Sequence, residues 1–226
     1  PKTVENFLSY VNSGAYVNNV VHRNVEGFVV QSGGFTYTGP ITSAGGFVLD
    51  NVATGTPVVN EPKLSNLRGT VAMAKLGGDP NSATSQWFFN LANNASNLDV
   101  QNGGFTVFGQ VIGDGMDVVD DIAAQTQGNF GGAFTNLPIR NYTQADADSG
   151  TDITDENLVI ISDIVVTDSA VVTNPTLNPV ANTLINPPVS GGDTGGGSGS
   201  GGGSFVWLSL FAALGLSRYV RRTKRS

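Results

Sequence analysis

Short apolar runs separated by turn-forming residues fill the first 168 residues and limit what this chain can fold into. Clusters of Gly, Asn and Pro divide these runs, and each run has the length and composition of a strand. The predicted strands are 27–31, 70–74, 86–91, 106–111 and 158–167. Strands this short favour a closed antiparallel barrel, because closure leaves no exposed sheet edge. We therefore predict a mainly β fold.

Two segments have helical periodicity instead. Between Thr3 and Ser13, apolar residues recur at i, i+3, i+4 and i+7, with Thr3 able to cap the start and Gly14 able to end the helix. A second apolar stripe predicts a helix from about Gly115 to Gln125. These helices are expected to cap the open ends of the barrel.

Charge and residue usage exclude several classes of function. The chain has a net charge of −7, but five of its 11 cations lie in the last nine residues, which leaves −12 on the rest. Such a body repels a phosphate backbone, so we expect no nucleic-acid binding. With no Cys and one His, thiolate and multi-histidine metal sites are excluded, and we expect no cofactor and no metal.

The composition changes after Asp168. Residues 169–204 are first rich in Thr, Asn, Pro and Val and then in Gly and Ser, which predicts an extended linker followed by flexible coil. Residues 205–226 are a short apolar segment with a basic end. We therefore expect one folded domain over residues 1–168, followed by a linker and a tail.

Several linked motifs resemble the cyclophilin family of peptidyl-prolyl cis/trans isomerases. They are, in order, TVENF at 3–7, VHRNVEGFVVQSGGFT at 21–36, GTVAMA at 69–74, TSQWFFNL at 84–91 and FTVFGQV at 105–111. The resemblance covers about residues 1–168. It implies a cyclophilin-like barrel that accelerates rotation about X-Pro bonds of proline-containing polypeptides.

The residue types in these motifs suit that chemistry. Amide resonance gives the peptide bond a rotation barrier of about 18–20 kcal/mol. A catalyst must hold the proline ring in an apolar slot and place a cationic donor where the twisted bond forms. Arg23 is the candidate donor because its guanidinium stays protonated. The alternative is a surface arginine in an ion pair.

The resemblance also implies the other site residues. Gln31 and Gln86 would act with Arg23 by gripping the substrate backbone, and strand alternation puts Gln31 on the face of Val29 and Gln86 on the face of Phe88. The remaining substrate-binding residues implied are Phe28, Val29, Ala74, Lys75, Phe88, Leu98 and Phe105. Ala74 and Lys75 would contribute main-chain groups only. The alternative for Phe28 and Phe88 is that they are ordinary core aromatics, and His22 is expected to be structural.

The sequence departs from the family pattern at a few positions. Asn97 stands where many members have Trp or Phe, so we expect weak inhibition by cyclosporin. Phe105 stands where many have His, and Val29 replaces the common Met. Family members also carry about two strands before the segment that starts at Pro1. Without them a barrel edge would be open, and a truncated sequence is the simpler account.

The tail suggests a location outside the cytoplasm. As a helix, the twelve residues 205–216 would rise only about 18 Å, short of the roughly 30 Å hydrocarbon core. A Gly/Ser-rich stretch, a short apolar segment and an Arg-rich end together resemble the GlyGly-CTERM sorting signal, and a simple membrane anchor is the alternative. In either case we expect an exported monomer, in the periplasm or at the cell surface, that contacts the membrane through residues 205–226 at least transiently.

Three functions fit these observations. The first is an isomerase that assists the folding of exported proteins. The second is a surface module that binds Pro-containing peptides with little or no turnover. The third is a structural spacer, for which an apolar groove would be unnecessary.

Overall fold

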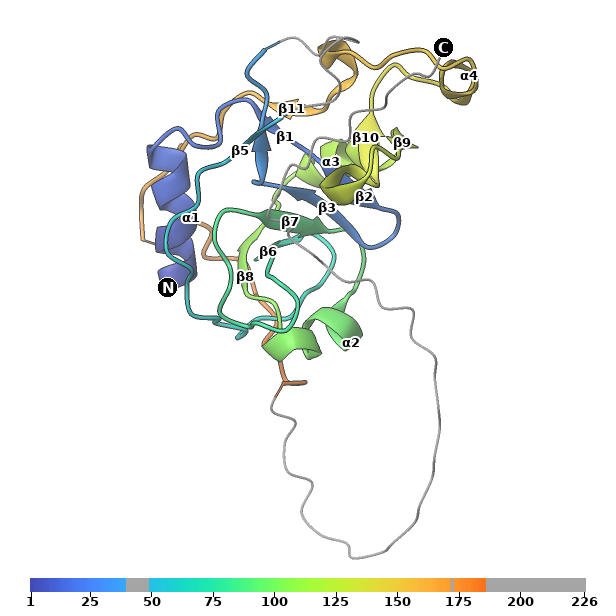
Figure 1. Ribbon diagram of the computed structural model, residues 1–226. Helices are drawn as coiled ribbons and strands as arrows, with labels where there is room; N and C mark the ends of the chain where they lie inside the picture. Colours follow the sequence, from blue (N-terminus) through green and yellow to red (C-terminus); the bar gives the residue numbers. More distant parts are fainter. Residues whose placement is uncertain (40–48, 172, 186–226) are drawn as a thin grey trace, which may run out of the picture.

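The computed structural model describes residues 1–39, 49–171 and 173–185, and its strands form three antiparallel sheets (Figure 1). The strand orders are β2-β3-β7-β6-β8, β11-β1-β4-β5 and β10-β9. The strands are β1 Asn19–Val20, β2 Arg23–Val25, β3 Val29–Ser32, β4 Phe35–Thr36, β5 Asp50–Asn51, β6 Thr70–Met73, β7 Trp87–Asn90, β8 Val107–Gln110, β9 Thr126–Gly128, β10 Leu137–Ile139 and β11 Ile160–Ile161. The α-helices are α1 Lys2–Asn12, α2 Ala95–Leu98, α3 Gly115–Ala123 and α4 Gln144–Asp148. The mainly β fold is confirmed.

Four of the five predicted strands are confirmed as β3, β6, β7 and β8, with ends that differ by at most two residues. The prediction of a long strand over 158–167 is wrong, because β11 contains only Ile160 and Ile161. Its partner β1 is equally short, and the chain turns before β1 at Asn18, whose φ is 53°. Beyond β11 the Asp163 carboxylate accepts the N–H of Ile164, so this backbone group is satisfied outside a sheet.

Both predicted helices are present, and each packs one face on the sheets. In α1, Tyr10 is buried and stacks on Tyr16 with ring centroids 5.5 Å apart. The predicted cap at Thr3 is wrong: Thr3 lies inside the helix, and its hydroxyl donates to the Glu61 carboxylate at 2.8 Å. The sequence did not predict the short helices α2 and α4.

Closure of the barrel stays a prediction. Among the strand pairings of the described residues, none joins the two edges of the five-stranded sheet. The sheet nevertheless carries the motifs that the sequence singled out, since β2, β3 and β7 lie next to one another in it.

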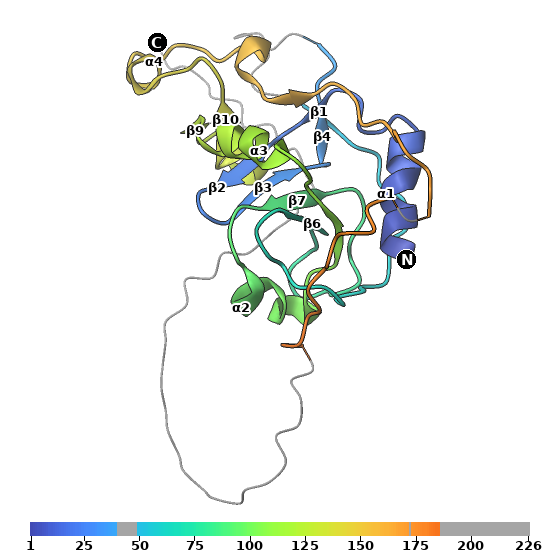
Figure 2. The ribbon, with the colours of Figure 1, turned by 180° about the vertical axis from the view of Figure 1, so that it is seen from behind.

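Part of the predicted linker is docked on the domain. The Ser65 N–H donates to Val180 O at 2.8 Å, and the Asn182 N–H donates to Lys63 O at 2.9 Å. The Asn182 side chain also donates to Asp99 O at 2.9 Å. Figure 2 shows this segment in orange, ending near α2. An extended conformation was expected here, but the anchoring contacts were not.

The predicted tail, 205–226, lies outside the described residues. Within the described part of the chain, every helix is too short or too polar to cross a lipid bilayer.

Candidate active site

The candidate site begins with a row of side chains across three neighbouring strands. Arg23 on β2 is opposite Gln31 on β3, and Gln31 is opposite Phe88 on β7. Residues opposite one another in an antiparallel pair share a face of the sheet. The strand register therefore brings Arg23 and Gln31 to the side on which Phe88 lies. Alternation within single strands predicted only that Gln31 shares a face with Val29 and Gln86 with Phe88.

Hydrogen bonds join the polar members of this row. Arg23 Nη1 donates to Gln31 Oε1 at 3.2 Å, and Gln31 Nε2 donates to Gln86 Oε1 at 2.7 Å. We call Arg23, Gln31 and Gln86 the polar row. Because Gln31 uses its oxygen on one side and its nitrogen on the other, the three side chains fix each other's orientation.

The guanidinium of Arg23 is not neutralised by any described carboxylate. The ion pair seen among the described residues is Arg68–Asp120, on the surface. Arg23 is partly buried, and that burial lowers the pKa of its guanidinium. An arginine remains protonated after such a shift, so Arg23 presents an unpaired positive charge with several N–H donors at the edge of an apolar region.

Next to the polar row lies one buried apolar cluster. Five of the predicted substrate-binding residues belong to it: Val29, Ala74, Phe88, Leu98 and Phe105. Phe28 is partly buried and packs against the same cluster. Trp87 belongs to a different cluster, which confirms that neighbouring residues of β7 point to opposite faces.

Three side chains of the cluster are closed to solvent in this structure. Val29, Phe88 and Leu98 are each 0% exposed. The open slot expected from the sequence is therefore not seen at these three side chains, although the residues expected to form it are together.

Comparison with known proteins assigns the chain to a family. The family model described as cyclophilin type peptidyl-prolyl cis-trans isomerase/CLD matches residues 1–144. The chain belongs to this family. Peptidyl-prolyl cis-trans isomerase A of Dickeya dadantii is 42% identical over 142 residues, which are 61% of this chain and 67% of that protein. Peptidyl-prolyl cis-trans isomerase B of Escherichia coli is 41% identical over 137 residues, 58% of this chain and 76% of that protein.

His22 of this cyclophilin domain adjoins the polar row, since it precedes Arg23 in the chain and its side chain is hydrogen-bonded to Gln86. It is 1% exposed, and its ring packs edge-on against Phe35 at 4.9 Å between centroids. Burial lowers the pKa of His22 to about 3, with the charge of Arg23 acting in the same direction. The imidazole is therefore neutral near pH 7 and cannot serve there as a proton donor of ordinary strength.

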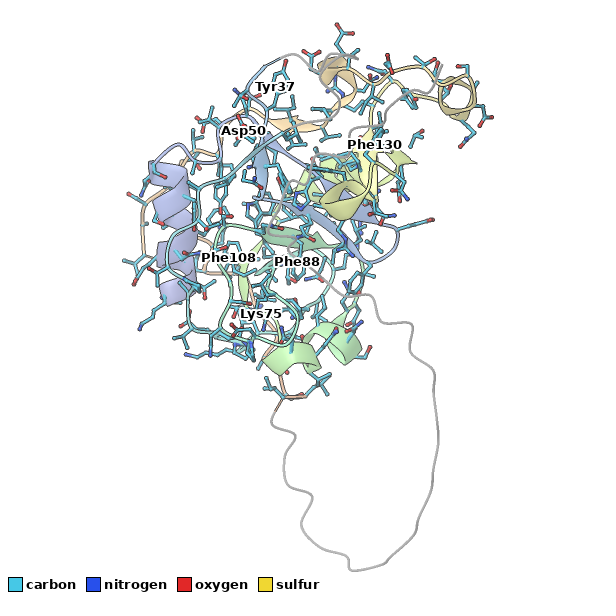
Figure 3. The ribbon with its side chains drawn as sticks, viewed as in Figure 1. Tyr37, Asp50, Lys75, Phe88, Phe108 and Phe130 are labelled. Carbon is cyan, nitrogen blue, oxygen red and sulfur yellow. The ribbon has the colours of Figure 1, made fainter. Side chains whose placement is uncertain are left out.

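The main chain of Ala74 is already engaged. Its N–H donates to Gln86 O at 2.9 Å, so this group is not free for a substrate peptide. Lys75 was expected to contribute its main chain alone, but its side chain is 2% exposed and reaches two carbonyl oxygens of the turn at 101–104. Figure 3 shows Lys75 and Phe88 in the region between β6, β7 and α2.

A cavity of about 550 Å³ adjoins the polar row on the side of Ala74 and Gln86. Asn51, Thr84 and Ser85 are among its lining residues and were not predicted as site residues. Thr84 and Ser85 immediately precede Gln86 in the motif TSQWFF, and this adjacency is the signal that could have found them. Asn51 reaches the cavity from a distant strand, β5, and has no such signal.

Proposed function

We propose that this chain accelerates cis–trans rotation about X-Pro bonds through the polar row. The observation that carries the proposal is the hydrogen-bonded chain Arg23–Gln31–Gln86 beside the apolar cluster of Phe88. In the twisted transition state amide resonance is lost, and the prolyl nitrogen becomes pyramidal and able to accept a hydrogen bond. A cationic donor held at that nitrogen stabilises the twisted state more than either planar state.

Each member of the row has its own task in this proposal. Arg23 donates to the prolyl nitrogen, while Gln31 holds the guanidinium in place through the 3.2 Å contact. Gln86 and Gln31 bind the substrate backbone, which leaves the carbonyl before proline free to swing. No proton transfer and no covalent bond is required, in keeping with a neutral, buried His22.

The apolar cluster would hold the proline ring. The wall is supplied by Phe28, Val29, Ala74, Phe88, Leu98 and Phe105, and Lys75 flanks it just after β6. Val29, Phe88 and Leu98 have no exposed surface. A proline ring can therefore contact them only if neighbouring side chains move aside.

The activity is tested with the full 226-residue chain and an uncharged proline peptide whose relaxation after a solvent jump is followed. The wild type should exceed the uncatalysed rate, and Arg23→Ala should lower kcat/KM by about 10² to 10³, as loss of one transition-state donor does. Arg140→Ala is the matched control, because Arg140 is also an arginine on the domain but is exposed. A wild type that binds the peptide without changing its rate would instead show a binding module, and one that neither binds nor accelerates would show a spacer.

We further propose that the isomerase assists the folding of exported proteins, in the periplasm or at the cell surface. The support is the order of a Gly/Ser-rich stretch, a short apolar segment and a basic end in residues 191–226. Fusing residues 169–226 to a reporter with an export signal should direct the reporter to the membrane fraction. A matched fusion with Arg218, Arg221 and Arg222 replaced by Gln should lose this retention. Equal amounts of both fusions in the soluble fraction would contradict the proposal.

A further inference from the structure

We propose that the Lys75 side chain is a positioning residue for the isomerase: it sets the turn at 101–104 and the Phe105 ring, and through them the face of Phe88. We call the turn together with Leu98 and Phe105 the loop wall. The inference rests on the proposed function, since it concerns the geometry of that same site. It goes beyond the family resemblance, which implied a role for the main chain of residue 75 alone.

The contacts of the ammonium group carry the inference. Lys75 follows β6 directly, and its Nζ donates to Asn102 O at 2.8 Å and to Gly104 O at 2.6 Å. In this turn Asn102, Gly103 and Gly104 all have positive φ, at 51°, 74° and 73°, and the carbonyl oxygens of Asn102 and Gly104 both accept from Nζ. Gly103 and Gly104 adopt positive φ freely and Asn102 tolerates it. Among the described residues, the ammonium is one of two side-chain groups that bind this turn; the other is the Asn60 amide, which donates to Gly103 O and Gly104 O at 2.8 Å each.

The same ammonium also contacts the ring that faces the candidate proline site. Nζ lies 4.7 Å from the centroid of Phe105, within the range of a cation–π interaction. The Phe105 ring in turn meets Phe88 edge-on, with centroids 5.9 Å apart and an interplanar angle of 68°. A continuous set of contacts thus runs from Lys75 through Phe105 to Phe88.

Burial of the Lys75 ammonium does not stabilise the fold. Lys75 is 2% exposed, and no described carboxylate pairs with its ammonium, so the charge is buried at a cost. Burial lowers the pKa of Lys75 to about 8, opposed by the charge of Asp79, the charged group whose field acts on it. Between about pH 8 and 10.5 Lys75 is protonated in the unfolded chain but not in the folded chain. The free energy of unfolding therefore rises with pH over this interval.

As pH rises, kcat/KM should therefore fall while the contribution of Lys75 to the free energy of unfolding rises. As pH rises through about 8, the ammonium loses its charge and with it the cation–π contact, while two N–H donors remain. We expect kcat/KM of the wild type for an uncharged proline peptide to fall several-fold between pH 7 and 9.5. Over the same interval the contribution of Lys75 to stability should rise.

The test compares the full-length wild type with Lys75→Met and Lys75→Arg. Lys75→Met should lower kcat/KM about tenfold at pH 7 by removing the donors and the charge, keep an unfolding midpoint at least equal to that of the wild type, and show no fall near pH 8. Lys75→Arg keeps a permanent charge and should likewise show no fall near pH 8. A Lys75→Met variant with wild-type kcat/KM, or one that keeps the wild-type pH profile, would overturn the inference.

A spectroscopic readout separates this inference from the proposed function. The Gly104 amide and Phe105 ring resonances should titrate near pH 8 in the wild type and not in Lys75→Met. If they titrate while kcat/KM stays constant, Lys75 binds the turn but does not position the site, and the inference fails alone. A wild type without any rate enhancement refutes the proposed function, and the inference with it.

Discussion

The two sides of the candidate site are held by different kinds of interaction. Two members of the polar row are placed by backbone pairing: Arg23 on β2 is opposite Gln31 on β3, which is in turn opposite Phe88 on β7. The loop wall is placed by side chains that bind backbone groups far away in the sequence, such as Lys75 on Gly104 O. A single substitution should therefore disturb the loop wall much more than the placement of the polar row.

The largest expected change in stability is at Asp99, which lies between Leu98 and the turn of the loop wall. This residue is 0% exposed, and its carboxylate accepts the N–H of Asn66 at 2.7 Å, the Asn66 side chain at 2.9 Å and the hydroxyl of Ser65. Asp99→Ala leaves the Asn66 N–H and the Ser65 hydroxyl without this acceptor, while the Asn66 side chain keeps Phe105 O at 3.0 Å. The variant should lower the free energy of unfolding by about 4 kcal/mol. Denaturant unfolding with the exposed Asp121→Ala as control checks this, and a loss below about 1 kcal/mol would show that the loop wall is held by other contacts.

A smaller loss of stability is expected at His22 as pH falls. The unfolded chain protonates His22 near pH 6.5, whereas the folded chain holds it neutral down to about pH 3, so stability falls as pH drops between these values. The loss due to His22 should approach about 1.4 kcal/mol per pH unit. Between pH 6.5 and 4.5 the unfolding midpoint should therefore fall more steeply for the wild type than for His22→Leu. Parallel slopes would mean that His22 titrates normally.

A double-mutant cycle tests whether the polar row acts as one unit. If Gln31 works by holding Arg23 through the 3.2 Å contact, then Arg23→Ala, Gln31→Ala and the double variant should give non-additive losses in kcat/KM. We expect a coupling of about 1 to 2 kcal/mol. Strict additivity would assign Gln31 an independent role, such as binding the peptide backbone.

The smallest change in stability is expected where the predicted linker meets the domain at Asp99. The Asn182 side chain donates to Asp99 O at 2.9 Å, and this contact is partly exposed. Asn182→Ala should lower the free energy of unfolding by about 1 kcal/mol, with Asn178→Ala, whose side chain bonds only to nearby Thr176 O, as control. An equal effect of the two variants would show that the linker does not stabilise the domain.

The polar row could be predicted from the sequence, and the loop wall only in part. Strand alternation placed Gln31 with Val29 and Gln86 with Phe88 because a period of two is local information. The side-chain role of Lys75 could not be predicted, because its acceptors lie 27 and 29 residues further on, in a turn whose left-handed conformation no local pattern fixed. The lack of exposed surface at Phe88 is also a property of tertiary packing.

The most direct test of the central claim is exchange NMR on the full chain with an uncharged proline peptide. In the bound peptide, wild-type protein should give cis–trans exchange cross-peaks within a mixing time of under a second, when the free peptide gives none. Arg23→Ala should bind the peptide and lose these cross-peaks, while Arg140→Ala keeps them. Bound peptide without exchange in the wild type, or undiminished exchange with Arg23→Ala, would contradict the account.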